Sequence, residues 1–169
     1  MSLNFSTLID SYEVSSSVSS VVLTGMSSSF STYQLFVANA EFVGTGSFRV
    51  GVQFQIAGTT DTRTLYSESG AVQVQDNNSY DDVNNTGLNH INLNSANNQN
   101  VFGGNHLLIM NSQDGTEYTY CESRGSTYTS SNRTKANYFG STFEVNAVIS
   151  GLEIKDTNGS NITQGYFYL

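Results

Sequence analysis

Residues 48–56 read Phe-Arg-Val-Gly-Val-Gln-Phe-Gln-Ile, with an apolar side chain at every second position. Successive side chains of a β-strand point to opposite faces of the sheet, so this period of two is typical of a strand with one buried face. The predicted buried set is Phe48, Val50, Val52, Phe54 and Ile56, and the predicted water-facing set is Arg49, Gly51, Gln53 and Gln55. The stretch therefore predicts a half-buried strand.

The same alternation recurs along the chain, and no segment shows the apolar period of a helix. Further strands are predicted at residues 12–14, 18–23, 33–38, 64–66, 72–74, 91–93, 106–110, 117–121, 143–149, 151–155 and 165–169. The strand at 106–110 is almost wholly apolar and is expected to be buried on both faces. These short strands predict an all-β chain.

Glycine and asparagine mark the expected connections between these strands. Gly44-Thr45-Gly46 is expected to join residues 33–38 and 48–56 as a hairpin, and residues 111–115 are expected to form the turn of a second hairpin. Residues 76–105, which are rich in asparagine, and residues 123–135 are expected to be mainly irregular loops. These two loops are the segments where a partner would be expected to dock.

Roughly ten short strands at this spacing favour an antiparallel two-sheet β-sandwich of jelly-roll type. The 169 residues fit one domain, residues 1–169, and no boundary or strong internal repeat divides them. Proline is absent, so no proline guards a sheet edge. The edges are therefore expected to be paired, twisted away or covered by another subunit.

Charge and cysteine content narrow the expected partners. The formal net charge is −8, so the chain repels phosphate backbones and nucleic-acid binding is not expected. Charged residues make up only 12%, which suits a surface that packs against a larger body; a neutral-surfaced sandwich without a special partner is the alternative. The single cysteine, Cys121, excludes an intrachain disulfide and suits a reducing cytosol. No secretory signal or membrane-spanning run is visible, so no membrane partner is expected.

No catalytic, cofactor-binding or metal-binding constellation is predicted. His90 and His106 lack the ligand spacing of a zinc site, and His106 is expected to be a hydrogen-bonded structural residue. Cys121 is expected to be a small packed side chain and not a nucleophile. The oxygen-rich segment 76–82 lacks the glycine and the closing glutamate of an EF-hand. An enzyme, such as a polysaccharide depolymerase, is therefore not expected.

Tyrosines are the residues predicted to contact a partner or a glycan. Exposed aromatic rings can stack on sugars, and Tyr80, Tyr128 and Tyr138 lie in or beside the predicted loops. The alternative is that these three rings cover the ends of the sheets and keep the phenol oxygen in water. Both interpretations place the rings near loops.

The C-terminal region resembles a known protein family. Residues 148–155 read Val-Ile-Ser-Gly-Leu-Glu-Ile-Lys, and residues 159–169 read Gly-Ser-Asn-Ile-Thr-Gln-Gly-Tyr-Phe-Tyr-Leu. This pattern resembles the closing hairpin of small β-sandwich virion proteins of tailed bacteriophages, many from marine and cyanobacterial hosts. Residues 31–37, Ser-Thr-Tyr-Gln-Leu-Phe-Val, which lead into residues 48–56, resemble the early hairpin of the same family. The asparagine-rich centre departs from the family pattern.

The resemblance implies a non-enzymatic virion structural protein, in the first place a capsid decoration (cement) protein that stabilises the shell or is displayed on it. The alternative is a tail-fibre or tail-tip domain that binds host surface glycans, although no heptad or collagen-like stalk accompanies it. The implied partners are other virion proteins of the capsid or tail, with a homo-oligomer expected and a trimer favoured. The implied location is the virion, after assembly in the host cytoplasm.

Overall fold

The computed structural model describes residues 7–43, 50–74, 79–93, 102–128 and 134–169, and these residues form strands and no helix. Eight strands pair side by side in a large sheet. In order across this sheet they are β1 (Ser11–Val14), β13 (Asn161–Tyr168), β3 (Thr32–Val43), β9 (Phe102–Met110), β10 (Thr119–Tyr128), β11 (Thr134–Phe143), β6 (Tyr66–Val74) and β7 (Ser79–Leu88). The predicted all-β fold is thereby confirmed.

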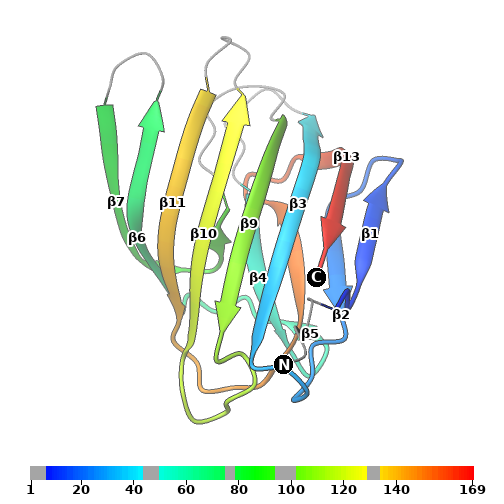
Figure 1. Ribbon diagram of the computed structural model, residues 1–169, viewed down its shortest axis with the longest axis vertical. Coiled ribbons are helices and arrows are strands. Elements are labelled where there is room, and N and C mark those ends of the chain that lie inside the picture. The colour runs from blue at the N-terminus through cyan, green and yellow to red at the C-terminus, as the bar shows by residue number, and fades with distance from the viewer. Residues whose placement is uncertain (1–6, 44–49, 75–78, 94–101, 129–133) are drawn as a thin grey trace, which may run out of the picture.

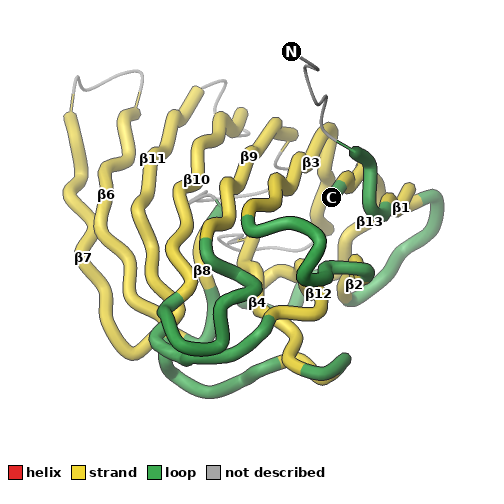
Figure 2. The backbone as a smooth tube through the Cα atoms, turned by 60° about the horizontal axis from the view of Figure 1, so that its bottom comes forward, coloured by secondary structure: helices red, strands yellow, loops and turns green. Residues whose placement is uncertain are grey.

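A second, small sheet packs against the inner face of the large one. Its strands are, in order, β2 (Ser20–Thr24), β12 (Ile149–Asp156), β4 (Val50–Ile56) and β5 (Thr59–Thr60), with β8 (Ile91–Asn92) also paired to β4. All pairings in both sheets are antiparallel. Figure 1 shows the large sheet in front of the small one, and Figure 2 shows the two layers from another side. The two-sheet sandwich is therefore confirmed.

Consecutive strands repeatedly pass from one sheet to the other. The predicted hairpin of residues 33–38 with residues 48–56 is wrong, because β3 lies in the large sheet and β4 in the small sheet. The predicted closing hairpin is wrong for the same reason, since β12 pairs with β2 and β4 whereas β13 pairs with β1 and β3. The β9–β10 hairpin is confirmed. In a sandwich the apolar core lies between two sheets, and consecutive strands can bury their apolar faces from opposite sheets. Neighbours in sequence therefore need not be neighbours in a sheet.

The core fills the space between the inner faces of the two sheets. Register places Leu23, Leu152 and Phe54 side by side across the small sheet, and none of them is exposed. Across the large sheet, Leu35 and Leu107 pair on the inward side and are equally buried. The alternation that marks the strands in the sequence therefore corresponds to one dry face per sheet.

Strand β4 is covered on both of its faces. Gln53 and Gln55, predicted to face water, are 1% and 6% exposed. Neighbouring chain covers them: Gln53 Nε2 donates to the Asn89 carbonyl at 2.7 Å, and Gln55 Nε2 donates to Thr60 Oγ1 at 3.4 Å. The burial predicted for Val50, Val52 and Phe54 is confirmed, whereas Phe48 and Arg49 lie outside the described residues. The two glutamines were misassigned because the alternation within one strand does not show that neighbouring chain covers its second face.

A buried polar network ties β8 to the large sheet. The Glu68 carboxylate accepts hydrogen bonds from Asn92 Nδ2 at 2.6 Å and from Asn85 Nδ2 at 3.0 Å. Ser123 Oγ donates to the Asn92 carbonyl. Asn137 Nδ2 donates to the carbonyl of Leu93, the residue that follows β8. These bonds satisfy backbone groups that the short strand β8 leaves unpaired.

Three predicted loops and strands need correction. Residues 79–88 form β7 and residues 102–105 already belong to β9, so much of the region 76–105 is strand and not irregular loop. Most of the predicted loop 123–135 belongs to β10 and β11. Conversely, residues 144–148, predicted as strand, form no strand between β11 and β12. Asparagine and serine obscured the long strands because sheet pairing overrides their preference for turns.

Candidate functional site

The outer face of the large sheet carries a lateral row of ring and guanidinium side chains. Antiparallel register places Tyr168 beside Phe36, Phe36 beside His106, His106 beside Arg124, and Arg124 beside Tyr138. Each of these five residues comes from a different strand, in the order β13, β3, β9, β10 and β11. We call this set the aromatic row. Paired residues on one face of a sheet lie about 5 Å apart, so the row is continuous.

Contacts between neighbours hold the aromatic row together. The rings of Phe36 and His106 stack with centroids 4.7 Å apart and planes 24° apart. The Arg124 guanidinium carbon lies 5.3 Å from the centre of the Tyr138 ring, a cation–π geometry. His106 Nε2 and Gln34 Oε1 share a hydrogen bond of 3.1 Å. The predicted hydrogen bonding of His106 is confirmed, but on the solvent side of the sheet.

The side chains of the aromatic row are unusually exposed for their type. Phe36 is 46%, Tyr138 48% and Tyr168 39% exposed. The same face also exposes Tyr120, which is 43% exposed and lies four residues before Arg124 on β10. Aromatic side chains that gather on one open face are typical of a surface that meets a ligand or another protein.

The electrostatics of the aromatic row favour an uncharged ligand. The pKa of His106 lies below its ordinary value, chiefly because the ring is partly buried and also because Arg124 is near, so the ring is neutral at neutral pH. Arg124 donates to the Glu122 carboxylate, which lowers the pKa of Glu122, with a smaller contribution from a hydrogen bond with Tyr138. The face therefore presents one neutralised ion pair among rings.

The aromatic row contributes little to stability, since its rings are half in water. We expect Phe36→Ser and Tyr138→Ser to lower the free energy of unfolding by less than about 1 kcal/mol. Leu35, the neighbour of Phe36 in the chain, points into the core and provides the contrast. Leu35→Ala should lower the free energy of unfolding by about 2–5 kcal/mol, because it leaves a cavity in the core. Urea unfolding of the three variants measures this, and equal losses at positions 35 and 36 would contradict the assignment of the two faces.

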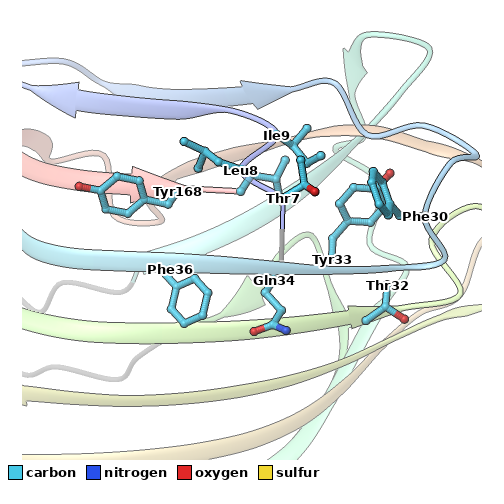
Figure 3. A pocket seen from close by; sticks show the side chains of 10 residues that line it. Thr7, Leu8, Ile9, Phe30, Thr32, Tyr33, Gln34, Phe36 and Tyr168 are labelled. Carbon is cyan, nitrogen blue, oxygen red and sulfur yellow. The ribbon is translucent and has the colours of Figure 1, made fainter. Parts of the chain in front are cut away.

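A pocket of about 490 Å³ opens at one end of the aromatic row. Three segments that are distant in sequence line it: residues 7–9, residues 30–36 and the C-terminal Tyr168 and Leu169. Figure 3 shows Leu8 near Tyr168, with Phe36 below them and Phe30 at the right beside Tyr33. We call it the N-terminal pocket. Of these, Leu8, Phe30, Phe36 and Tyr168 are among the exposed large apolar residues, with Leu8 at 63%.

Backbone hydrogen bonds fix the walls of the N-terminal pocket. The Ile9 amide donates to the Leu169 carbonyl at 2.6 Å, and the Leu169 amide donates to the Asp10 carbonyl at 2.9 Å. On the opposite wall, the Tyr33 hydroxyl donates to the Ser27 carbonyl at 2.6 Å and accepts from the Ser27 amide at 2.8 Å. The pocket is therefore formed by anchored chain and suits an apolar side chain of a partner.

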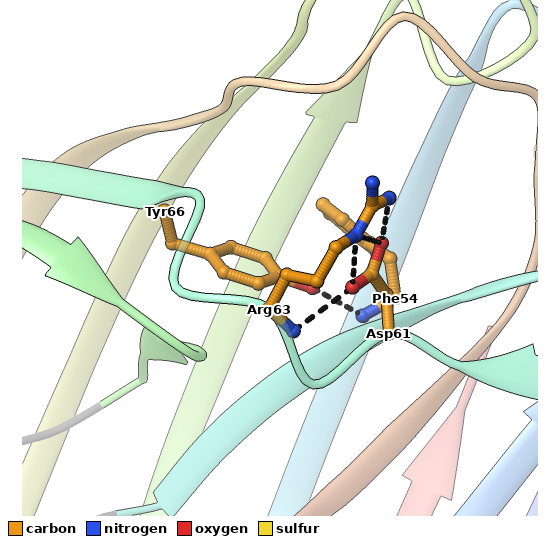
Figure 4. Close-up of polar contacts among 4 residues, drawn as sticks. All are labelled: Phe54, Asp61, Arg63 and Tyr66. Atoms are coloured by element: carbon orange, nitrogen blue, oxygen red, sulfur yellow. Dashed lines mark hydrogen bonds and ion pairs between the residues drawn. The ribbon is translucent and has the colours of Figure 1, made fainter.

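A cluster of titratable residues around Asp61 is structural. Asp61 is 8% exposed and accepts hydrogen bonds from the backbone amide and the guanidinium of Arg63, while the Tyr66 hydroxyl accepts the Phe54 amide at 2.9 Å (Figure 4). Burial raises the pKa of Tyr66 above its ordinary value, so the phenol stays protonated. The Tyr66 ring also packs on Phe143 with centroids 4.6 Å apart. The cluster therefore braces the core.

Removal of the Tyr66 hydroxyl should destabilise the fold. Tyr66→Phe keeps the ring but leaves the buried Phe54 amide without its acceptor, so the free energy of unfolding should fall by about 1–3 kcal/mol. Urea unfolding measures the change. Tyr118→Phe, at an exposed tyrosine, is the matched control and should be neutral; an equal effect at the two positions would refute the role of the hydroxyl.

The Asp61–Arg63 pair should make stability depend on pH. Hydrogen bonding from Arg63 is the largest cause that lowers the pKa of Asp61 below 3.8 in the folded protein. A carboxylate with a lowered folded pKa stabilises the fold above its unfolded pKa, and this contribution is lost as the pH falls through the folded pKa.

We therefore expect Asp61→Asn to be less stable than the wild type at about pH 7, and the gap to close by about pH 2. Urea unfolding across this range is the measurement. Glu13→Gln, at an exposed carboxylate of β1, is the control and should follow the wild-type curve. A gap that is constant with pH would show that the carboxylate charge is not the source.

The structure places the three predicted tyrosines in strands and not in loops. Tyr138 lies in the middle of β11 and belongs to the aromatic row, so it neither covers a sheet end nor sits in a loop. The backbones of Tyr80 and Tyr128 lie in β7 and β10, and their side chains lie outside the described residues. Contact with a partner or a glycan stays a prediction for all three residues.

Sequence reasoning missed most of the aromatic row. His106 begins a strand that was predicted to be buried on both faces, because residues 106–110 are almost wholly apolar. The pairing of Phe36 with Tyr168 and of His106 with Arg124 depends on strands far apart in sequence. The one local signal is the alternation of Tyr166 and Tyr168, whose rings stack with centroids 6.5 Å apart.

Other chemical sites find no support within the described residues. Cys121 is buried, as predicted, and burial raises the pKa of its thiol. Across the described ranges, no group of three or more His, Cys, Asp or Glu side chains is close enough to hold a metal ion. No helix of sufficient length and apolarity to cross a membrane occurs in the part of the chain that the structure describes.

No family model, no curated protein and no solved structure matches the chain.

Proposed function

We propose that the protein is a non-enzymatic structural protein of a tailed-bacteriophage virion, of the capsid decoration type, assembled in the host cytoplasm. The sequence resemblance of residues 148–155 and 159–169 motivates the proposal. The observation that carries it is the N-terminal pocket, where four exposed apolar side chains from three distant segments meet. Exposed apolar side chains that gather in this way suit attachment to another protein.

The proposal includes a jelly-roll topology for the sandwich. A jelly roll is a double sheet of eight strands. Two four-stranded sets support this assignment: β1-β13-β3-β9 are neighbours in the large sheet, and β2-β12-β4-β8 are neighbours in the small sheet. The chain alternates between the sets from β1 to β4 and again from β8 to β13, while β10, β11, β6 and β7 extend the large sheet. Such folds include viral capsid and lectin domains, but a fold alone does not define a function.

The proposal also includes a homo-oligomer, with a trimer favoured, bound to other capsid or tail proteins. The support is that β1 and β7 end the large sheet, so each leaves one side of its backbone unpaired within the sheet. Such edges are commonly covered by a neighbouring chain. Sedimentation of the purified protein measures the oligomeric state.

Attachment should depend on the apolar wall of the N-terminal pocket. Leu8→Ser and Phe30→Ser each remove a side chain that a partner would bury, at a loss of about 1.5–3 kcal/mol, so binding should weaken about tenfold or more. The assay supplies purified variant protein to particles assembled without it and counts bound copies by quantitative mass spectrometry. Val148→Ser, at a 49% exposed residue that does not line the pocket, is the control.

Two outcomes would contradict the decoration role. One is a chain that is absent from wild-type particles, or that is present at the low copy number of a tail tip. The other is unchanged occupancy for Leu8→Ser and Phe30→Ser.

A tail-fibre or tail-tip domain that binds host surface glycans is the second candidate. The exposed Tyr138 ring beside Arg124 favours it, because aromatic rings with nearby polar groups suit sugar binding.

A further inference from the structure

A hollow about 490 Å³ in volume lies on the outer face of the large sheet, beside the aromatic row. Register places Gly104, Ser126 and Ala136 next to one another on β9, β10 and β11, two residues along from His106, Arg124 and Tyr138. The three small residues form a floor, and the longer side chains of Arg124 and Tyr138 form a wall. We call this feature the trough. It arises because small side chains lie beside large ones on the same face.

The floor of the trough is open to solvent. A Cβ atom built on Gly104 would meet no other atom within 4 Å. Ser126 and Ala136 are both exposed. Nothing among the described residues therefore fills the space above the floor.

The wall of the trough offers a ring face and hydrogen-bonding groups together. The Tyr138 ring is 48% exposed, and the Arg124 side chain is 66% exposed. Arg124 directs Nε and Nη2 to one oxygen of Glu122, Oε1, at 3.2 and 2.5 Å. A guanidinium has five N–H donors, so Arg124 retains donors for a ligand, while Glu122, which does not line the trough, balances its charge.

We propose that the trough binds a neutral glycan, with one sugar ring stacked on Tyr138 and its hydroxyl groups hydrogen-bonded to Arg124. A pyranose ring has an apolar face of C–H groups and a rim of hydroxyl groups, and the wall offers the complement of each. The inference does not require the decoration role, because the trough and the N-terminal pocket have no lining residue in common. It gives the second candidate function a defined site.

Charge selects among ligands that could stack on the same ring. Nucleic-acid bases and acidic sugars also stack on tyrosine, but the phosphates of the one and the carboxylates of the other bring negative charge. The chain has a formal net charge of −8, and the positive charge of Arg124 is already balanced by Glu122. Anionic ligands are therefore disfavoured and neutral hexoses are favoured.

The shape of the trough predicts weak binding by a single site. A shallow open site buries only part of a sugar ring, so dissociation constants near the millimolar range are expected. Several copies of the chain on one particle would raise the overall avidity without any new contact.

Titration followed by NMR of uniformly ¹⁵N-labelled protein tests the proposal. The probes are four neutral oligosaccharides, cellohexaose, maltohexaose, laminarihexaose and mannohexaose, with oligogalacturonate as the acidic comparison. We expect at least one neutral probe at millimolar concentration to shift the amides of Gly104, Ser126 and Ala136, and oligogalacturonate to leave them unchanged.

Three variants locate the binding. Tyr138→Ala should weaken it at least tenfold, and Gly104→Leu should block it, since the new side chain enters the trough without meeting other atoms of the protein at its Cβ. Tyr120→Ala removes an equally exposed tyrosine from the same strand as Arg124 but outside the trough, and it should bind like the wild type. Urea unfolding of each variant confirms that it remains folded.

Several results would overturn the proposal. These are no shift with any neutral probe, preference for oligogalacturonate, or shifts that persist unchanged in Gly104→Leu. A capsid protein that binds through Tyr138 in place of a glycan would also overturn it. Since Leu8→Ser leaves the trough intact, loss of particle attachment in that variant with retained glycan shifts separates the two proposals.

Discussion

The apolar layer between the two sheets is the constraint on which the rest of the structure depends. Phe54 of the small sheet packs against Tyr66 and Phe143 of the large sheet, with ring centroids 5.9 and 5.3 Å apart. These rings come from β4, β6 and β11, so the layer joins segments that are distant in the chain. With no disulfide available to one cysteine, packing of this kind is the main source of stability.

Side-chain hydrogen bonds complete the apolar layer where buried polar groups are not paired between strands. The Tyr66 hydroxyl accepts a hydrogen bond from the Phe54 backbone amide. The Glu68 carboxylate accepts hydrogen bonds from the side-chain amides of Asn85 and Asn92. Each bond satisfies a buried group that would otherwise destabilise the fold. The short strand β8 depends most on such bonds, because it has only two residues and pairs with β4 alone.

The apolar core lies between the two sheets, so side chains on the outer face of the large sheet contribute little to stability. Rings can lie there half in water, as Phe36 and Tyr138 do, and small residues can lie beside them without leaving an internal cavity. The N-terminal pocket forms at the end of the same face, where the first and last described segments meet β3. One open face thus carries the N-terminal pocket and the trough, which have no lining residue in common.

The sequence by itself determined the all-β class and the position of most strands, because a period of two in apolar residues is a local property of the chain. It also predicted that Cys121 is packed, and the structure confirms this. Only the tertiary structure decided which strands share a sheet, so both predicted hairpins between β3 and β4 and between β12 and β13 failed. Register between distant strands placed Phe36, His106 and Tyr138 in one row, and the chain at Asn89 covers Gln53. These outcomes depend on contacts between residues far apart in sequence, which no local pattern encodes.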